Sequence, residues 1–175
     1  MINDMRQFVP SQVCLACDGC CRFKEETSVW RPRISQSEKE QVTTKPGLAE
    51  KIFSKAALAA DGHLRAIACH GLYICTFFNP EHNTCGIYHA RPFDCQLYPF
   101  VLTKSQDKTV ISVHLNCPYV QEKKDSEEFE RYVEYLQKFF LREEVMTFLK
   151  KNSGLVGDYS AYRDELSELF ELHLK

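Results

Sequence analysis

The stretch Cys14-Leu-Ala-Cys17-Asp-Gly-Cys20-Cys21 places four cysteines within eight residues near the start of the chain. Two residues between cysteines let a tight turn point both flanking sulfurs at one metal, and Gly19 can take the left-handed conformation that such turns often need. Adjacent side chains diverge, so we expect Cys21 to address a second metal or the edge of a cluster. Core packing rarely requires four thiols so close together. The run therefore predicts a metal site.

Five further cysteines follow this run. Four of them lie among turn residues rather than inside apolar periodic segments: Cys75, Cys85, Cys95 and Cys117. Together with the first run they supply eight thiolates. Cys69 is the ninth cysteine, and we expect it to be a core or free thiol, because an unpaired cysteine usually behaves as a small hydrophobic residue.

The composition is that of an ordinary globular protein. A length of 175 residues with 44% hydrophobic and 26% charged residues favours one domain over 1–175. We expect a metal-binding core over 13–118 and a helical extension over 125–175. The net charge of -2 gives no reason to expect nucleic acid as a partner.

Neither a signal peptide nor a membrane span is indicated, since the first residues lack an apolar stretch behind a basic start. The expected compartment is the cytoplasm, with no membrane partner. Thiols stay reduced there, so clustered cysteines are better explained as metal ligands or redox groups than as disulfides.

Local patterns predict an α+β fold, a small irregular cysteine-rich domain followed by a C-terminal pair of helices. Ser35 and Glu38 have capping-box spacing and predict a helix start, and a second helix is expected over 47–60, ended by Gly62. Residues 63–120 should form loops and short strands. Within them, two β-rich runs over 99–115, separated by the polar stretch 105–108, predict a hairpin.

The last fifty residues show helical periodicity. An amphipathic helix is expected after a cap at Asp125, with its apolar face formed by Phe129, Val133, Leu136 and Phe140. A further helix is expected over 158–175. These two helices offer a surface for a protein partner.

The thiolate set suits two kinds of metal centre. Eight thiolates divide into two zinc sites of four sulfurs each, which would be structural. Iron-sulfur clusters also take four thiolates, and Cys14, Cys17 and Cys20 with Cys117-Pro118 loosely reproduce the bacterial ferredoxin pattern. The spacing slightly favours an iron-sulfur cluster, such as a 4Fe-4S cluster, over zinc, and a mixed site stays open.

The run at Cys14–Cys21, followed by C85-G-I-Y-x-x-R91-P92-x-x-C95-x-x-Y98-P99-F100, resembles the bacterial CxxCxxCC cysteine-cluster proteins, described as zinc- or iron-chelating domains. The resemblance spans roughly 13–118 and implies that the eight cysteines bind metal. Flagellin lysine-N-methylases contain a similar segment, which implies an alternative role as an enzyme or enzyme accessory in protein modification.

Several neighbouring residues are candidates for supporting roles. Arg91 and Arg22 are placed to donate hydrogen bonds to sulfur, and Arg91 is our candidate cofactor-binding residue. With eight thiols available, we expect the histidines near them not to be ligands: His70, His82, His89 and His114. The main hypothesis is a cytoplasmic metal-binding protein with a structural, metal-handling or electron-transfer role. A dithiol-disulfide oxidoreductase is less favoured, because no strand clearly precedes the run.

Overall fold

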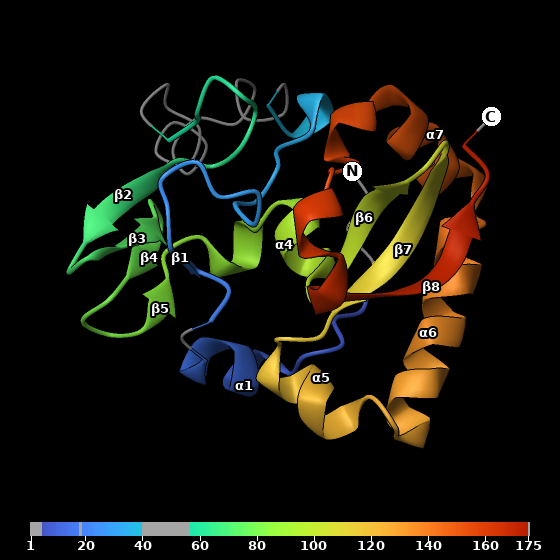
Figure 1. Ribbon diagram of the computed structural model, residues 1–175, viewed down its shortest axis with the longest axis horizontal. Coiled ribbons are helices and arrows are strands. Elements are labelled where there is room, and N and C mark those ends of the chain that lie inside the picture. Colours follow the sequence, from blue (N-terminus) through green and yellow to red (C-terminus); the bar gives the residue numbers. More distant parts are fainter. Residues whose placement is uncertain (1–4, 18, 40–56, 175) are drawn as a thin grey trace. The chain divides into compact units, whose positions relative to one another are not determined.

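Helices and small antiparallel sheets make up the chain, which confirms the predicted α+β class (Figure 1). The structure is a computed structural model and describes residues 5–17, 19–39 and 57–174. Contacts between Cα atoms divide the chain into two units, one formed by 11–95 and the other by 2–10 with 96–175.

The unit over 11–95 contains short elements joined by turns. Two small antiparallel sheets are present, with the strand orders β1-β3-β2 and β4-β5. The elements are α1 (Ser11–Ala16), β1 (Arg22–Phe23), β2 (Ala66–Cys69), β3 (Leu72–Cys75), β4 (Phe78–Asn79), β5 (Thr84–Cys85), the 3-10 helix η1 (Tyr88–Ala90) and the start of α4 (Phe93–Leu97). The prediction of short strands and loops after residue 63 is confirmed here.

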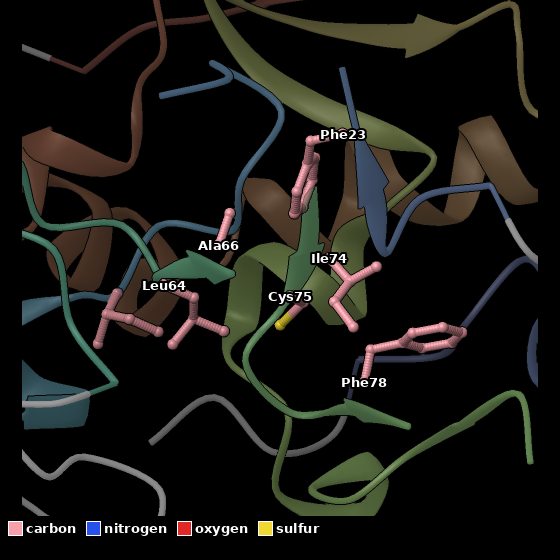
Figure 2. Close-up of a cluster of buried hydrophobic side chains, with 7 residues drawn as sticks. Phe23, Leu64, Ala66, Ile74, Cys75 and Phe78 are labelled. Atoms are coloured by element: carbon pink, nitrogen blue, oxygen red, sulfur yellow. The ribbon is translucent and has the colours of Figure 1, made fainter. Parts of the chain in front are cut away.

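A buried hydrophobic cluster holds this unit together (Figure 2). Its members come from β1, β2, β3 and β4 and from the chain before β2: Phe23, Ile34, Leu64, Ala66, Ile74, Cys75 and Phe78. Burying such side chains supplies the main favourable term in folding. Cys75 lies in this cluster, so one candidate ligand is fixed to the core of the unit.

The predicted capping box is confirmed. The amide of Glu38 donates to Ser35 Oγ (3.1 Å), and the amide of Ser35 donates to Glu38 Oε2 (2.8 Å), so a helix begins over 36–39. The other carboxylate oxygen of Glu38 accepts from the amide of Phe93 (2.6 Å), the first residue of α4. The helix expected over 47–60 lies mostly outside the described residues, and 57–60 form a turn and a bridge instead of its last turn.

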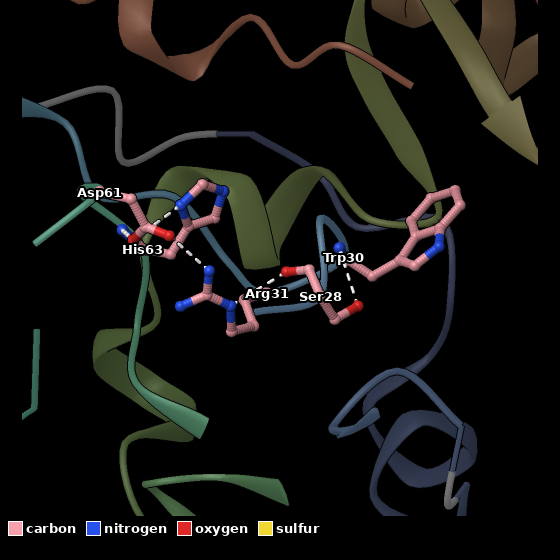
Figure 3. A network of polar contacts seen from close by, with 5 residues as sticks. All are labelled: Ser28, Trp30, Arg31, Asp61 and His63. Carbon is pink, nitrogen blue, oxygen red and sulfur yellow. Dashed lines mark hydrogen bonds and ion pairs between the residues drawn. The ribbon is translucent and has the colours of Figure 1, made fainter. Parts of the chain in front are cut away.

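A second polar network joins residues 28–31 to 61–63 (Figure 3). The side chain of Arg31 is only 4% exposed; it donates to the carbonyl of Ser28 (3.0 Å) and pairs with Asp61. Asp61 also accepts from the amide of His63 (3.1 Å). A buried guanidinium needs such partners, because an unpaired buried charge is costly.

The second unit is built on a three-stranded antiparallel sheet with the order β6-β7-β8. Its elements are β6 (Phe100–Ser105), β7 (Lys108–His114), α5 (Pro118–Lys123), α6 (Glu127–Phe140), α7 (Glu143–Lys151), the 3-10 helices η2 (Ser153–Leu155) and η3 (Ser160–Glu165), and β8 (Leu166–Leu172). The hairpin expected over 99–115 is confirmed as β6 and β7, which pair from Phe100 with Val113 to Ser105 with Lys108.

Aromatic residues form much of the core of this unit. Phe8 packs edge-to-face on Phe100 and Phe129, with ring centroids 5.6 and 5.5 Å apart, and Phe140 and Leu136 of α6 are fully buried. The predicted amphipathic helix is therefore confirmed as α6. Its cap is Ser126 rather than Asp125, because Ser126 Oγ accepts from the amide of Phe129 (3.3 Å).

The helix expected over 158–175 is wrong. A C-terminal pair of helices is present, but its second member is α7, and the last segment forms η3 and β8. The leucines and glutamates of β8 favour a helix on their own, but β7 would otherwise leave one edge unpaired. A bulge opposite Ile111 and Ser112, where Leu169 is the extra residue, breaks the period-two pattern of the strand.

None of the helices in the described ranges combines the length and the apolar character that crossing a membrane requires.

Replacing Asp61 by asparagine should lower the free energy of unfolding by about 1–2 kcal/mol, because it leaves the buried Arg31 without its anion. The loss is modest because solvent screens the charge of the half-exposed Asp61. Partial burial raises the pKa of Asp61, but hydrogen bonds and charge from Arg31 and His63 lower it from 3.8 to about 2. The contribution is therefore fully present above about pH 4 and is lost as the pH falls toward 2.

Denaturant unfolding of the wild type and of Asp61→Asn at pH 7 and pH 3 measures this effect. The difference between the two proteins should shrink at pH 3. Asp107→Asn, at an exposed position in the turn between β6 and β7, serves as the control. A difference that is the same at both pH values would contradict the assignment to Asp61.

Candidate metal centre

The cysteine run begins on α1 and continues through two tight turns. The amide of Cys17 donates to the carbonyl of Cys14 (3.2 Å), and the amide of Arg22 donates to the carbonyl of Gly19 (3.1 Å). The amide of Gly19 lies 3.4 Å from Cys17 Sγ and donates to it. The turns are thus present, but Gly19 does not use a left-handed conformation, since the described glycines with positive φ are Gly62 and Gly71.

Thiols from distant parts of this unit meet around Cys20. The thiol of Cys20 interacts electrostatically with five others, and we call the six together the thiol cluster: Cys14, Cys20, Cys21, Cys75, Cys85 and Cys95. Cys14 comes from α1, Cys75 from β3, Cys85 from β5 and Cys95 from α4. The fold therefore gathers residues that are up to 81 positions apart in the sequence.

Cys21 acts on its neighbour Cys20. A side-chain hydrogen bond with Cys21 and the charge of Cys21 both raise the pKa of the Cys20 thiol. The carbonyl of Cys21 accepts from the amide of Cys75 (2.9 Å), where β1 approaches β3. This backbone bond fixes the run to the sheet.

Arg91 is the cation of the thiol cluster. Its Nη1 lies 3.7 Å from Cys14 Sγ and donates to it, and its Nε donates to the carbonyl of Tyr88 (3.0 Å). The guanidinium carbon also lies 3.8 Å from the centre of the Tyr88 ring, a cation-π contact that holds the group in place. Arg91 therefore has the position expected of a donor to sulfur, whereas Arg22 contacts Asn83.

Burial and mutual repulsion raise the pKa of five of these thiols, which favours their protonated forms. Burial raises the pKa of Cys75 to about 11, and it raises the pKa of Cys14 and of Cys85. The pKa of Cys20 is raised well above 9.0 by the hydrogen bond with Cys21 and by burial, and burial together with Cys75 does the same for Cys95. The charge of Arg91 acts in the opposite direction on Cys14, Cys20, Cys85 and Cys95.

The remaining cysteines have other surroundings. Cys17 is half-buried, and its sulfur accepts the Gly19 amide. Cys69, at the end of β2, packs against the hydrophobic cluster of this unit. Cys117 belongs to the second unit, where it is buried and occupies the N-cap position of α5 without a capping hydrogen bond from its side chain. Six of the eight predicted ligands thus belong to the thiol cluster. Cys17 lies in the same unit but outside the cluster, and Cys117 lies in the second unit.

No group of three or more histidine, cysteine, aspartate or glutamate side chains in the described ranges has the arrangement of a formed metal site. The thiol cluster is a gathering of sulfur donors with a neighbouring guanidinium. Thiolates are the donors that zinc, copper(I) and iron-sulfur clusters prefer, so the chemistry of the set fits a soft metal centre.

The four histidines lie outside the thiol cluster. His70, His82 and His89 are exposed. His114 is in the second unit, where Nδ1 lies 2.9 Å from Tyr98 Oη and Nε2 lies 3.2 Å from Glu165 Oε2. Because both ring nitrogens of His114 have partners, a metal would have to displace one of them.

Sequence reasoning missed Asn83, which joins the turn before Cys85 to the cysteine run. Its backbone has a positive φ of 50°. Asparagine is one of the residues that tolerates this conformation, so an asparagine two positions before a candidate ligand was the available signal.

A comparison with protein families finds one match. The CxxCxxCC model, described as "Putative zinc- or iron-chelating domain", covers residues 13–151. No curated protein and no solved structure gives a significant match.

Replacing Arg91 by glutamine should slow alkylation of Cys14 and Cys85 in metal-free protein about two- to threefold at pH 8. The reason is that the guanidinium lowers the pKa of both thiols, and only the thiolate reacts. Mass spectrometry after timed iodoacetamide treatment measures each site. Arg65→Gln, which removes an exposed arginine of the same unit, is the matched control. Equal rates in the two variants would contradict the role of Arg91.

Proposed function

Because the chain belongs to the CxxCxxCC family of zinc- or iron-chelating domains, we propose that it binds metal through its gathered thiolates. The observation that carries this proposal is the interaction of Cys20 with thiols from α1, β3, β5 and α4. Core packing alone does not require five other thiols around one. The proposed ligands are Cys14, Cys17, Cys20, Cys21, Cys75, Cys85, Cys95 and Cys117.

An iron-sulfur cluster is the centre that we favour, with zinc as the alternative. Two independent zinc sites need eight thiolates in two separate sets, whereas the thiols of the first unit interact as one group with Cys20 in common. A single polynuclear centre uses such a group more readily. The C-x2-C-x2-C spacing of Cys14, Cys17 and Cys20 supports the same choice.

Arg91 would assist either centre. Thiolates bound to metal carry excess negative charge, and a hydrogen bond from a guanidinium to sulfur offsets part of it. The contact of Arg91 with Cys14 and its charge interactions with Cys20, Cys85 and Cys95 support this role.

The proposed biological role is structural, metal-handling or electron-transferring, in the cytoplasm. Metal bound by the thiol cluster would link four short elements of a unit whose sheets have strands of two to four residues. Small units of this kind often depend on metal for stability. The C-terminal helices are the proposed surface for a protein partner, and Leu141, between α6 and α7, is 79% exposed there.

Metal analysis of protein purified without oxygen tests the proposal. We expect iron with acid-labile sulfide, a visible absorption band from the cluster, and loss of that band on chelation or oxidation. Zinc with no colour would support metal binding and overturn the cluster assignment. Protein that contains neither metal, and that binds neither when supplied, would overturn the proposed function.

Replacing Cys20 by alanine should abolish most metal binding and lower the melting temperature, because each of the other five thiols in the cluster interacts with Cys20. Cys69→Ala is the matched control, since Cys69 lies in the same unit but outside the thiol cluster. We expect Cys69→Ala to retain at least about 80% of the metal. Similar losses in both variants would indicate general unfolding rather than loss of a ligand.

A further inference from the structure

Asn83 connects the turn between β4 and β5 to both ends of the cysteine run. Its Nδ2 donates to the carbonyls of Leu15 and Cys17, both at 3.3 Å. Its Oδ1 accepts from Nη1 and Nη2 of Arg22, at 3.3 and 3.4 Å. One side chain therefore contacts the chain on either side of Cys20.

The two carbonyls lie where α1 ends. Helix α1 finishes at Ala16, so the carbonyls of its last turn lack partners within the helix. The Asn83 amide supplies a donor to the carbonyl of Leu15 and to that of Cys17. These bonds hold the end of α1, and with it Cys14, next to the turn that leads into Cys85.

Arg22 provides the second attachment. The guanidinium carbon of Arg22 lies 4.6 Å from the centre of the Phe78 ring, and Phe78 belongs to the buried hydrophobic cluster. Arg22 also pairs with Ile74 in the sheet. Asn83 Oδ1 is therefore bound to an arginine that packs against the hydrophobic cluster, while Asn83 Nδ2 binds the cysteine run.

We infer that Asn83 is a positioning residue for the candidate metal centre, which sets Cys14, Cys17 and Cys20 relative to Cys85. This inference rests on the proposed function. Asn83 does not serve as a ligand, because its amide nitrogen and oxygen are both engaged. Each of its bonds is long and individually weak, so its effect is on the placement of the sulfurs more than on the stability of the fold.

The test uses two asparagines of the same β4-β5 segment. Asn83→Asp keeps the acceptor for Arg22 and tolerates the positive φ, but it loses both donors and sets a carboxylate against two carbonyls. Asn79→Asp adds the same charge but keeps the hydrogen bonds of residue 79. Asn79 Oδ1 only accepts hydrogen bonds, from the amides of Glu81 and His82, and an aspartate oxygen can accept them too. Asn83→Gly removes the amide without adding charge.

Metal-loaded protein is mixed with excess chelator, and the release rate and the melting temperature are measured. We expect Asn83→Asp and Asn83→Gly to bind the wild-type amount of metal but to release it about tenfold faster, as is typical when an outer hydrogen-bond partner of a metal site is lost. Asn79→Asp should release metal at the wild-type rate. Release from both Asn83 variants within twofold of Asn79→Asp would overturn the inference.

A measurement on metal-free protein separates this inference from the proposed function. Amide hydrogen exchange over 14–22 should be faster in both Asn83 variants than in Asn79→Asp, whether or not metal binds. If the wild type binds no metal, the proposed function fails, and equal exchange in all variants then overturns the positioning role of Asn83 as well.

Discussion

Electrostatic interaction among the thiols around Cys20 is the constraint on which the candidate metal centre depends. Thiols can be gathered by a fold while they are neutral, and burial favours the neutral form of Cys75, Cys85 and Cys95. Deprotonation would place several negative charges in a poorly solvated space, with Arg91 as a neighbouring cation. The gathered arrangement is therefore favourable either with protons on the sulfurs or with a cation among them, and binding of a metal would exchange the first state for the second.

Backbone contacts, rather than the thiols themselves, hold this arrangement in the described structure. The bond from Cys75 to the carbonyl of Cys21 ties the run to β3, and Glu38 bridges a helix start at Ser35 to the first residue of α4, two positions before Cys95. These contacts join segments that are more than fifty residues apart, and they satisfy backbone amides. A thiol-rich site supported in this way can gain or lose its occupant while the surrounding backbone keeps its connections.

Features governed by neighbours in the sequence were predictable, and those governed by distant partners were not. The capping box of Ser35 and Glu38, the β6-β7 hairpin and the apolar face of α6 follow from short patterns and are present. The strand β8 is an exception because its partner, β7, is more than fifty residues earlier, and pairing overrides helix propensity there. The spacing of the cysteines indicated a metal site, but the central place of Cys20 and the contacts of Asn83 arise only when β3, β5 and α4 fold together.

Residues 5–10 belong to a different unit from the cysteine run that follows them. Phe8 packs among Phe100, Tyr119 and Phe129 of the second unit, and Tyr132 and Tyr135 bond the backbone of Arg6. The unit over 11–95 is thus inserted into the sequence of the second unit, which is formed by two separate segments of the chain. A natural variant or cleavage product that began at Ser11 would keep every cysteine. It would lose Phe8, and so it would disrupt the aromatic core of the second unit.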